Sequence, residues 1–279
     1  MKSFIGKFGA AALLGLCVFS FAWSQGQGAA GGGAAPAQGQ VQPGTPAAAP
    51  VPQVSKEELD AYNKFVVDVK AAGDARQKVN LGEAFIIAYP NSMYAGTVHG
   101  QLAMNYLSVN EVDKMIAAGE KALASDPNNV DVLPLMAFAL PRRNGTTVQQ
   151  LDAAMNYARR AINLLSTMPT PAGLDEATFA KLKNEKLAQC RSGMGTAYFK
   201  AGKYDEAVNE LAQAVKLDPN PDPVDYYVLG LSNDRSSHFQ DAIAAFDKCA
   251  GIPGSLQANC RNLSVETKRK AANSLEAPR

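Results

Sequence analysis

An internal repeat is the feature that most constrains how this chain can fold. The segment 195–219 is echoed by the segment 230–254, with an apolar stretch, a short polar turn and a second apolar stretch in each. Corresponding residues such as Gly195 and Gly230 lie 35 positions apart. A period near this length is typical of helical-pair repeats, whose units bury their apolar faces only by stacking on neighbours. The sequence therefore predicts a stack of helices.

The residues of the first copy fit two helices joined by a tight turn. Tyr198 follows Gly195 by three positions, so the two lie on one face of the first helix. Gly202 can end that helix in a left-handed conformation. Pro219 ends the second helix, because the residue before a proline disfavours helical geometry. Small residues such as Gly195 and Ala207 let the two backbones approach, and aromatic side chains fill the remaining space.

This pattern resembles the tetratricopeptide (TPR) repeat, in which Leu-Gly-x-x-Tyr is followed by Ala, Phe and Pro. Gly195 with Tyr198 carries the match in the first copy, and Leu229-Gly230 carries it in the second. The second copy departs from the pattern at Asn233, where tyrosine is usual. The resemblance implies an all-α fold, a right-handed α-α superhelix (TPR solenoid) of about five helix pairs plus a C-terminal helix.

Weaker copies of the pattern come earlier in the chain. Ser55 and Glu58 have the spacing of a capping box at the start of a first helix, and Gly73 separates that helix from the next. A second pair begins near Ser92, and we expect Asn110 to cap its second helix. These two pairs extend the predicted stack toward the N-terminus.

The third pair is irregular. Pro141 ends its first helix early, and the segment 142–145 makes a long turn. Thr146 with Gln149 predicts a capping box for a helix that runs through Leu165. The insertion is either a functional loop or a tolerated surface excursion, and the residues alone leave both open.

The C-terminal half continues the helical pattern. Residues 175–201 predict one long helix that leads into the fourth pair, and residues 255–272 predict a terminal helix after the fifth. The basic run 268–270 gives that helix a polar outer end, as a solenoid needs for solubility. We interpret the run as a solvated helix end rather than a nucleic-acid site.

The N-terminal segment has the pattern of an export signal. Lys2 and Lys7 precede a short apolar run, 8–21, and Ala22-Trp23-Ser24 is a small-x-small cleavage site. We expect residues 1–24 to be a signal peptide cleaved after Ser24. An uncleaved anchor helix is the alternative, although the run is short for a membrane span. The leader style favours a Gram-negative bacterium and a location in the periplasm or cell envelope.

The remaining boundaries follow from composition. Residues 25–54 consist mostly of Gly, Ala, Gln and Pro, and no charged residue lies between Lys7 and Lys56. Such a segment has little to bury and is expected to be a disordered linker. Residues 55–272 then form the TPR domain, and residues 273–279 form a C-terminal tail.

Charge and motifs exclude several classes of function. Without Lys2 and Lys7 the chain has 25 basic against 26 acidic residues, so nothing predicts a nucleic-acid partner. There is no Gly-rich phosphate loop, Gly-x-Ser-x-Gly elbow or His-Glu-x-x-His motif. His99 and His238 are far apart and fit packing or helix-start positions. We therefore expect no enzyme, no cofactor and no metal site, and no membrane insertion after signal cleavage.

The cysteines fit an oxidising compartment. Cys249 lies late in the second helix of the fifth pair and Cys260 early in the next helix, where a disulfide would attach the last helix to the stack. Two buried free thiols are the alternative. Cys190 is left unpaired and is expected to be buried.

The resemblance also implies a binding surface, because the first helix of each pair lines the concave side and TPR domains mostly bind peptides or protein surfaces there. Some TPR domains grip a C-terminal carboxylate with a Lys and Asn set, but Ser192, Gly193 and Thr196 occupy those places here, so that clamp is not expected. Each groove candidate has packing between repeats as its alternative role. The candidates are Gln189, Ser192, Thr196, Phe199 and Lys200 in the fourth pair, Tyr227, Leu231 and Arg235 in the fifth, and Met104, Leu107 and Phe138 earlier.

Together these features predict a protein-interaction module or scaffold of the bacterial envelope that binds a peptide or protein in its concave groove. A structural, self-associating component of an envelope assembly is the alternative, and an enzyme or ligand carrier is a weaker one. The identity of the partner and the oligomeric state do not follow from the sequence.

Overall fold

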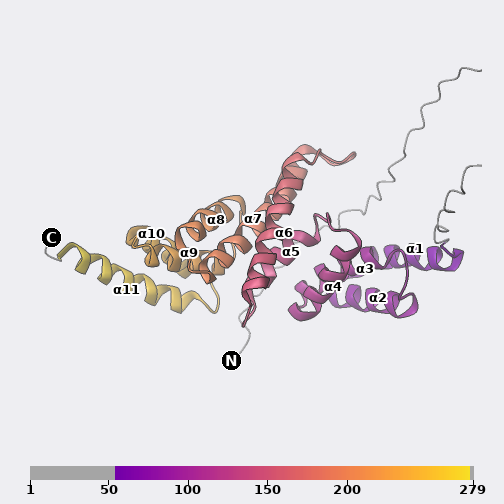
Figure 1. Ribbon diagram of the computed structural model, residues 1–279, viewed down its shortest axis with the longest axis horizontal. Coiled ribbons are helices and arrows are strands. Elements are labelled where there is room, and N and C mark those ends of the chain that lie inside the picture. Colours follow the sequence, from indigo (N-terminus) through magenta and orange to yellow (C-terminus); the bar gives the residue numbers. More distant parts are fainter. Residues whose placement is uncertain (1–53, 277–279) are drawn as a thin grey trace, which may run out of the picture.

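Eleven α-helices and one 3₁₀ turn make up residues 54–276, the part of the chain that the computed structural model describes. The helices follow one another along the long axis of the molecule (Figure 1). They are α1 (Lys56–Ala71) with α2 (Ala75–Ala88), α3 (Ala95–Ser108) with α4 (Val112–Ser125), α5 (Val132–Ala139) and the turn η1 (Leu140–Arg142) with α6 (Val148–Thr167), α7 (Glu176–Lys200) with α8 (Tyr204–Leu217), α9 (Pro223–Arg235) with α10 (Phe239–Gly251), and finally α11 (Gln257–Glu276).

The packing is that of a solenoid. Each helix packs on the next one in sequence, and the first helices of neighbouring pairs also touch, α3 with α5, α5 with α7 and α7 with α9. A row of first helices therefore lines one side of the stack, and the second helices lie behind it. The described residues contain no strand. The all-helical TPR superhelix predicted from the repeat is confirmed.

Two glycines at equivalent places let the paired helices approach. A Cβ atom on Gly195 would lie 2.5 Å from Leu211 Cγ, and one on Gly230 would lie 2.5 Å from Phe246 Cε1. Real Cβ atoms do not approach other atoms so closely, so both positions require the missing side chain. Phe246 and Leu211 are fully buried in return. Burial of such a side chain is worth about 1.5–3 kcal/mol, so the repeat period reflects a packing requirement.

The turns inside the pairs share one geometry. Gly202, Ser237 and Asn110 have φ values of 74°, 62° and 61°. In each case the N–H of the following residue donates to the carbonyl five positions before it, at 2.8–2.9 Å. This is the Schellman end of a helix, with one left-handed residue. The left-handed Gly202 was expected. The expectation that Asn110 caps α4 is wrong: it closes α3 instead, because asparagine tolerates positive φ.

The capping box of α6 lies one residue later than predicted. Thr147 accepts from the backbone of Gln150 at 3.2 Å, and the Gln150 side chain accepts from the Thr147 N–H at 3.0 Å. The predicted pair of Thr146 and Gln149 is therefore wrong. The Thr146 hydroxyl donates instead to carbonyls of the preceding turn, including that of Leu140 at 2.9 Å. That bond fixes the irregular connection between η1 and α6.

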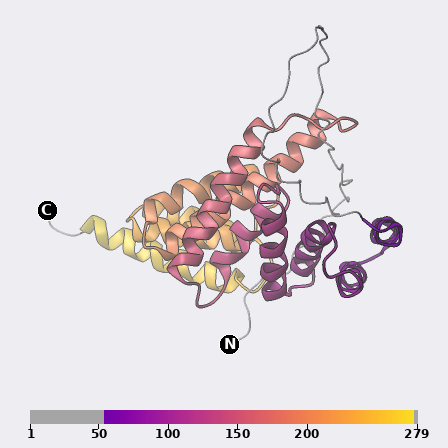
Figure 2. The same ribbon diagram turned by 45° about the vertical axis from the view of Figure 1, so that its right-hand side comes forward.

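The third and fourth pairs depart from regular repeat lengths. Helix α6 has 20 residues and α7 has 25, whereas α8 has 14. The connection between α6 and α7 lies at the tip of a projection from the stack (Figure 2). The side chain of Asp175 caps α7 by accepting from the N–H of Thr178 at 2.9 Å, so the predicted long helix begins and ends as expected.

Helix α11 is held by one covalent bond and several polar contacts. Cys249 and Cys260 form the predicted disulfide, with their Cα atoms 5.8 Å apart. The buried Ser264 hydroxyl donates to Asp247 at 2.5 Å, and Lys270 donates to Asp234 at 2.8 Å. The basic run at the end of this helix is thus partly paired rather than fully solvated, and α11 continues beyond residue 272 to Glu276.

The remaining cysteine of the described region, Cys190, is buried and free. Burial raises the pKa of its thiol to about 12. The thiolate is the reactive form of cysteine, so this side chain behaves as a small apolar core residue.

Loss of the disulfide should loosen α11 selectively. The bond spans a sequence separation of 11 residues, and loops of this size stabilise by about 3 kcal/mol in the chain-entropy model. In the double variant Cys249→Ser, Cys260→Ser, we expect faster amide hydrogen exchange in α11 and unchanged exchange in α7 and α8, because solenoid units depend mainly on their neighbours. Equal acceleration across all helices would contradict this assignment.

Candidate protein-binding groove

The row of first helices carries all of the groove residues predicted from the repeat register. Three of them are buried: Ser192 is 1%, Thr196 4% and Phe138 7% exposed. These three pack between repeats and are not available as contact residues, so they are removed from the candidate surface. The others are half-buried or exposed, namely Gln189, Phe199, Lys200, Tyr227, Leu231, Arg235, Met104 and Leu107.

A buried polar cluster explains why the middle of the row is filled. Arg142 Nη2 donates to Asp225 Oδ1 at 2.6 Å, and the Ser192 hydroxyl donates to the same oxygen at 2.5 Å. The guanidinium of Arg142 also lies over the ring of Phe138, 3.6 Å from its centroid. Turn η1, helix α7 and helix α9 are therefore joined across three consecutive pairs by the Arg142–Asp225–Ser192 cluster.

The electrostatics of this cluster are dominated by burial. The side chains of Arg142 and Asp225 are only 10% and 8% exposed. Burial raises the pKa of Asp225, and the nearby Arg142 charge opposes that rise. The Nε atom of Arg142 has no hydrogen-bond partner within the described residues. Such a pair holds its two elements in a fixed geometry, because removal of one partner leaves a buried charge alone.

Sequence reasoning missed this cluster. Arg142 belongs to the insertion whose role was left open, and Asp225 sits in the first turn of α9, where an acidic residue fits any helix start. The two are 83 residues apart, and no local pattern links them. The first residue of the insertion, Arg142, therefore packs inside the stack, where it contacts Asp225.

The C-terminal ends of α7 and α9 form the accessible part of the row. The ring of Phe199 lies 5.8 Å from that of Tyr204, so it covers the turn of the fourth pair. Lys200 Nζ donates to the carbonyl of Arg143 at 2.8 Å. Burial lowers the pKa of Lys200. Within residues 54–276 neither Lys200 nor Arg235 takes part in a salt bridge.

The N-terminal end of the row is mainly apolar. Met104 and Leu107 on α3 pack with their stems against the main core and remain half-exposed. At the start of α3, Tyr94 stacks on Tyr62 of α1 at a centroid distance of 4.0 Å. This end offers apolar contact area.

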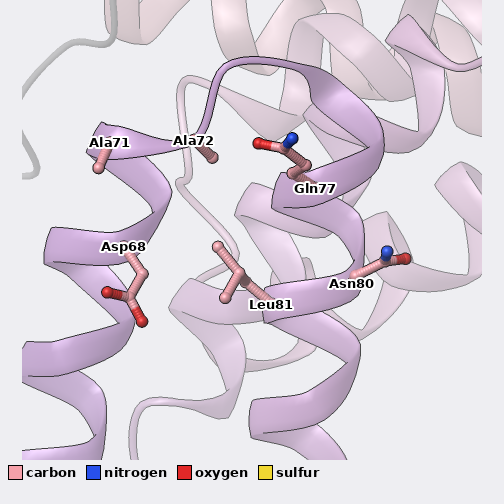
Figure 3. Close-up of a pocket in the computed structure, with 6 residues that line it drawn as sticks. All are labelled: Asp68, Ala71, Ala72, Gln77, Asn80 and Leu81. Atoms are coloured by element: carbon pink, nitrogen blue, oxygen red, sulfur yellow. The ribbon is translucent and has the colours of Figure 1, made fainter.

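Two hollows in the surface are lined by none of the predicted groove residues. One, of about 460 Å³, lies between α1 and α2 and is lined by Asp68, Gln77, Asn80 and Leu81 with two alanines (Figure 3). The other, of about 410 Å³, lies between the α4–α5 connection and the end of α6. Neither includes His99, whose pKa is lowered by burial and by the Lys121 charge. In the described part of the chain no three His, Cys, Asp or Glu side chains gather as metal ligands.

The comparison with protein families agrees with this geometry. The family model described as "TPR repeat" matches residues 195–232, which are the end of α7 from Gly195 on, helix α8 and most of α9. The chain therefore contains the TPR repeat that its sequence pattern resembles. Its repeats place it in a group of protein-interaction scaffolds, and a protein partner is the kind of ligand that such a surface takes.

Solved structures with a similar fold include two MamA structures. The structure named MamA AMB-1 is 20% identical over 71% of this chain and 100% of its own, with a TM-score of 0.48. MamA from Desulfovibrio magneticus RS-1 is 15% identical over 70% of this chain and 94% of its own, with a TM-score of 0.46. No curated protein matches this TPR-repeat chain at a significant level.

A helix crosses a membrane only if it is long and predominantly apolar. Between residues 54 and 276, no helix combines the length and the apolar content that a crossing requires. The expected leader, residues 1–24, and all but the last residue of the expected linker, 25–54, lie outside the described residues.

Truncation of Arg142 should cost more stability than a typical surface pair. In Arg142→Ala the carboxylate of Asp225 stays buried without its cation, and we expect a loss of about 3–5 kcal/mol in the free energy of unfolding at pH 7. The double variant Arg142→Ala, Asp225→Ala should lose less, since no lone charge remains. Urea unfolding measures both. Lys64→Ala, which breaks an exposed pair with Asp68, is the matched control and should change stability by about 0.5 kcal/mol or less.

The pH dependence of the stability loss in Arg142→Ala tests whether the buried charge of Asp225 causes it. Burial holds the pKa of Asp225 above its unfolded value, so the folded state binds the proton more tightly than the unfolded state. The penalty should therefore shrink as the pH falls from 7 toward about 4, the usual range of an aspartate. A penalty that stays constant between these pH values would point to lost packing instead.

Proposed function

We propose that this TPR-repeat protein is an exported binding scaffold of a bacterial cell envelope, which holds a peptide or a protein surface in its concave groove. The observation that supports the proposal is the mixture of half-exposed apolar side chains, Phe199, Tyr227 and Leu231, with the unpaired cations Lys200 and Arg235 on adjacent first helices. Apolar anchors surrounded by polar groups are the usual composition of a protein-binding surface.

The envelope location rests on three features of the chain. The leader pattern of residues 1–24 favours export. The uncharged segment that follows is suited to tether a domain at a distance from a membrane or complex. The Cys249–Cys260 disulfide is consistent with an oxidising compartment.

Export has a direct test in the protein's source organism. Mass spectrometry of the protein from the cell envelope should find Gln25 as the first residue, because cleavage is expected after Ser24. A protein that retains Met1 and residues 2–24 would support the anchor alternative, and recovery from the cytosol would rule out the envelope role.

A structural, self-associating component is the second candidate. It is favoured by apolar side chains that face solvent in α2 and in the connection that follows α2. Ile87 is 81% exposed and Met93 is 65% exposed. Exposed groups of this kind at the open end of a stack are suited to end-to-end contact. Sedimentation of the purified protein separates the candidates, since stable homo-oligomers at micromolar concentration favour this one.

Site-specific cross-linking tests the groove. A photoreactive residue in place of Leu231, half-buried on α9, should form adducts with a partner in intact cells, because it lies in the accessible part of the row. The same residue in place of Lys216, which is exposed on α8 behind the row, is the control and should form none. Adducts of equal yield from both positions, or from Lys216 alone, would place the binding surface elsewhere.

A further inference from the structure

The cations at the ends of α7 and α9 form a repeated feature. Lys200 and Arg235 are equivalent repeat positions, 35 residues apart, and each is the last residue of its helix. The two helices are in contact, and the axes of packed helices lie roughly 8–10 Å apart. We call this pair, with the half-exposed Phe199, Tyr227 and Leu231 beside it, the basic rim.

The charges next to the basic rim are not balanced by the protein. From residue 188 to its end, α7 has no acidic side chain. Helix α9 has two, but Asp225 is bonded to Arg142 at 2.6 Å and Asp234 to Lys270 at 2.8 Å. The α7 cation Arg191 is likewise paired, with Glu210 at 2.8 Å. The two carboxylates of α9 are thus engaged elsewhere, and Asp205 of α8 accepts a hydrogen bond at 2.5 Å from the hydroxyl of Ser236, the residue after Arg235. Within residues 54–276 no salt bridge neutralises Lys200 or Arg235.

Lys200 shows the consequence of that imbalance. Its ammonium group is partly desolvated, and its one hydrogen bond within the described residues goes to the neutral carbonyl of Arg143 at 2.8 Å. Burial therefore lowers the pKa of Lys200, with no carboxylate to offset the effect. A carboxylate brought to this place by a ligand would gain a charge-assisted hydrogen bond at a site that has already lost part of its water.

We propose that the basic rim binds an acidic segment of a partner protein, with one or two carboxylates at Lys200 and Arg235 and an adjacent aliphatic or aromatic side chain on Leu231, Tyr227 and Phe199. This rests on the proposed function and specifies the chemistry of its partner. The chain's own linker is not the occupant, because residues 25–54 contain no acidic residue. The ligand needs acidic side chains, so it differs from a purely apolar or Pro-rich peptide.

Selection from a library of random twelve-residue peptides, displayed on phage, tests this on the purified full chain. We expect enriched peptides in which Asp or Glu lies next to Leu, Phe or Tyr. Synthetic copies should bind about five- to thirtyfold more weakly to the variant Lys200→Gln, Arg235→Gln, the loss expected for two exposed ion pairs. The control Lys216→Gln, Lys248→Gln removes two exposed cations from α8 and α10 and should bind as the parent does. Unchanged thermal unfolding of both variants shows that they are folded.

The outcomes separate this inference from the proposed function. Enriched peptides without acidic residues would overturn the acidic partner, and so would equal binding to the rim variant and the parent. If Leu231→Asp nevertheless abolishes the binding of these peptides, the proposal that the groove binds peptides is retained. Failure to enrich any peptide, together with no cross-links from position 231, would overturn both. Self-association in sedimentation that the rim variant removes would identify a second copy as the occupant and overturn the foreign segment.

Discussion

The close approach of neighbouring helix backbones is the constraint on which the rest of the structure depends. No single pair has enough thickness to bury its own apolar face, so each must press against the next. Glycines mark the places where this happens: at Gly193 a Cβ atom would collide with the backbone carbonyl of Ala137 in the preceding first helix. Gly195 and Gly230 serve the same purpose within their pairs. The row of first helices, and therefore any surface along it, is set by these contacts.

A buried ion pair then fixes how three of the pairs sit together. Apolar packing is tolerant of small shifts, whereas the bonds from Arg142 and Ser192 to one oxygen of Asp225 are directional. The cluster costs desolvation, and a well-packed apolar replacement of similar volume is often as stable. Its consequence here is geometric: it fills the groove at its middle and leaves the ends of α7 and α9 as the exposed part. The buried cluster and the exposed helix ends thus lie on different turns of the same helices.

The repeat period made the fold predictable, and the site only in part. Glycine spacing identifies helix pairs because it reports a local packing requirement, and the Cys249–Cys260 bond follows from the order of helices. The repeat register also places side chains such as Ser192 on the side of the stack lined by first helices. It does not predict which residues cover them, because Asp225 and Arg142 belong to other repeats. Adjacent residues with similar side chains cause errors of one position in the predicted helix caps. Thr146 and Thr147 can both cap a helix, and only the bond from Thr146 to Leu140 decides between them.

The same division explains why the rim keeps its charge. Some cations elsewhere in the stack are paired internally, as Arg191 is with Glu210 and Lys270 is with Asp234, whereas Lys200 and Arg235 form no salt bridge within residues 54–276. The ammonium group of Lys200 donates to the carbonyl of Arg143, and burial lowers its pKa. In this solenoid the second helices and the buried cluster maintain the shape, and the last residues of α7 and α9, Lys200 and Arg235, stay exposed.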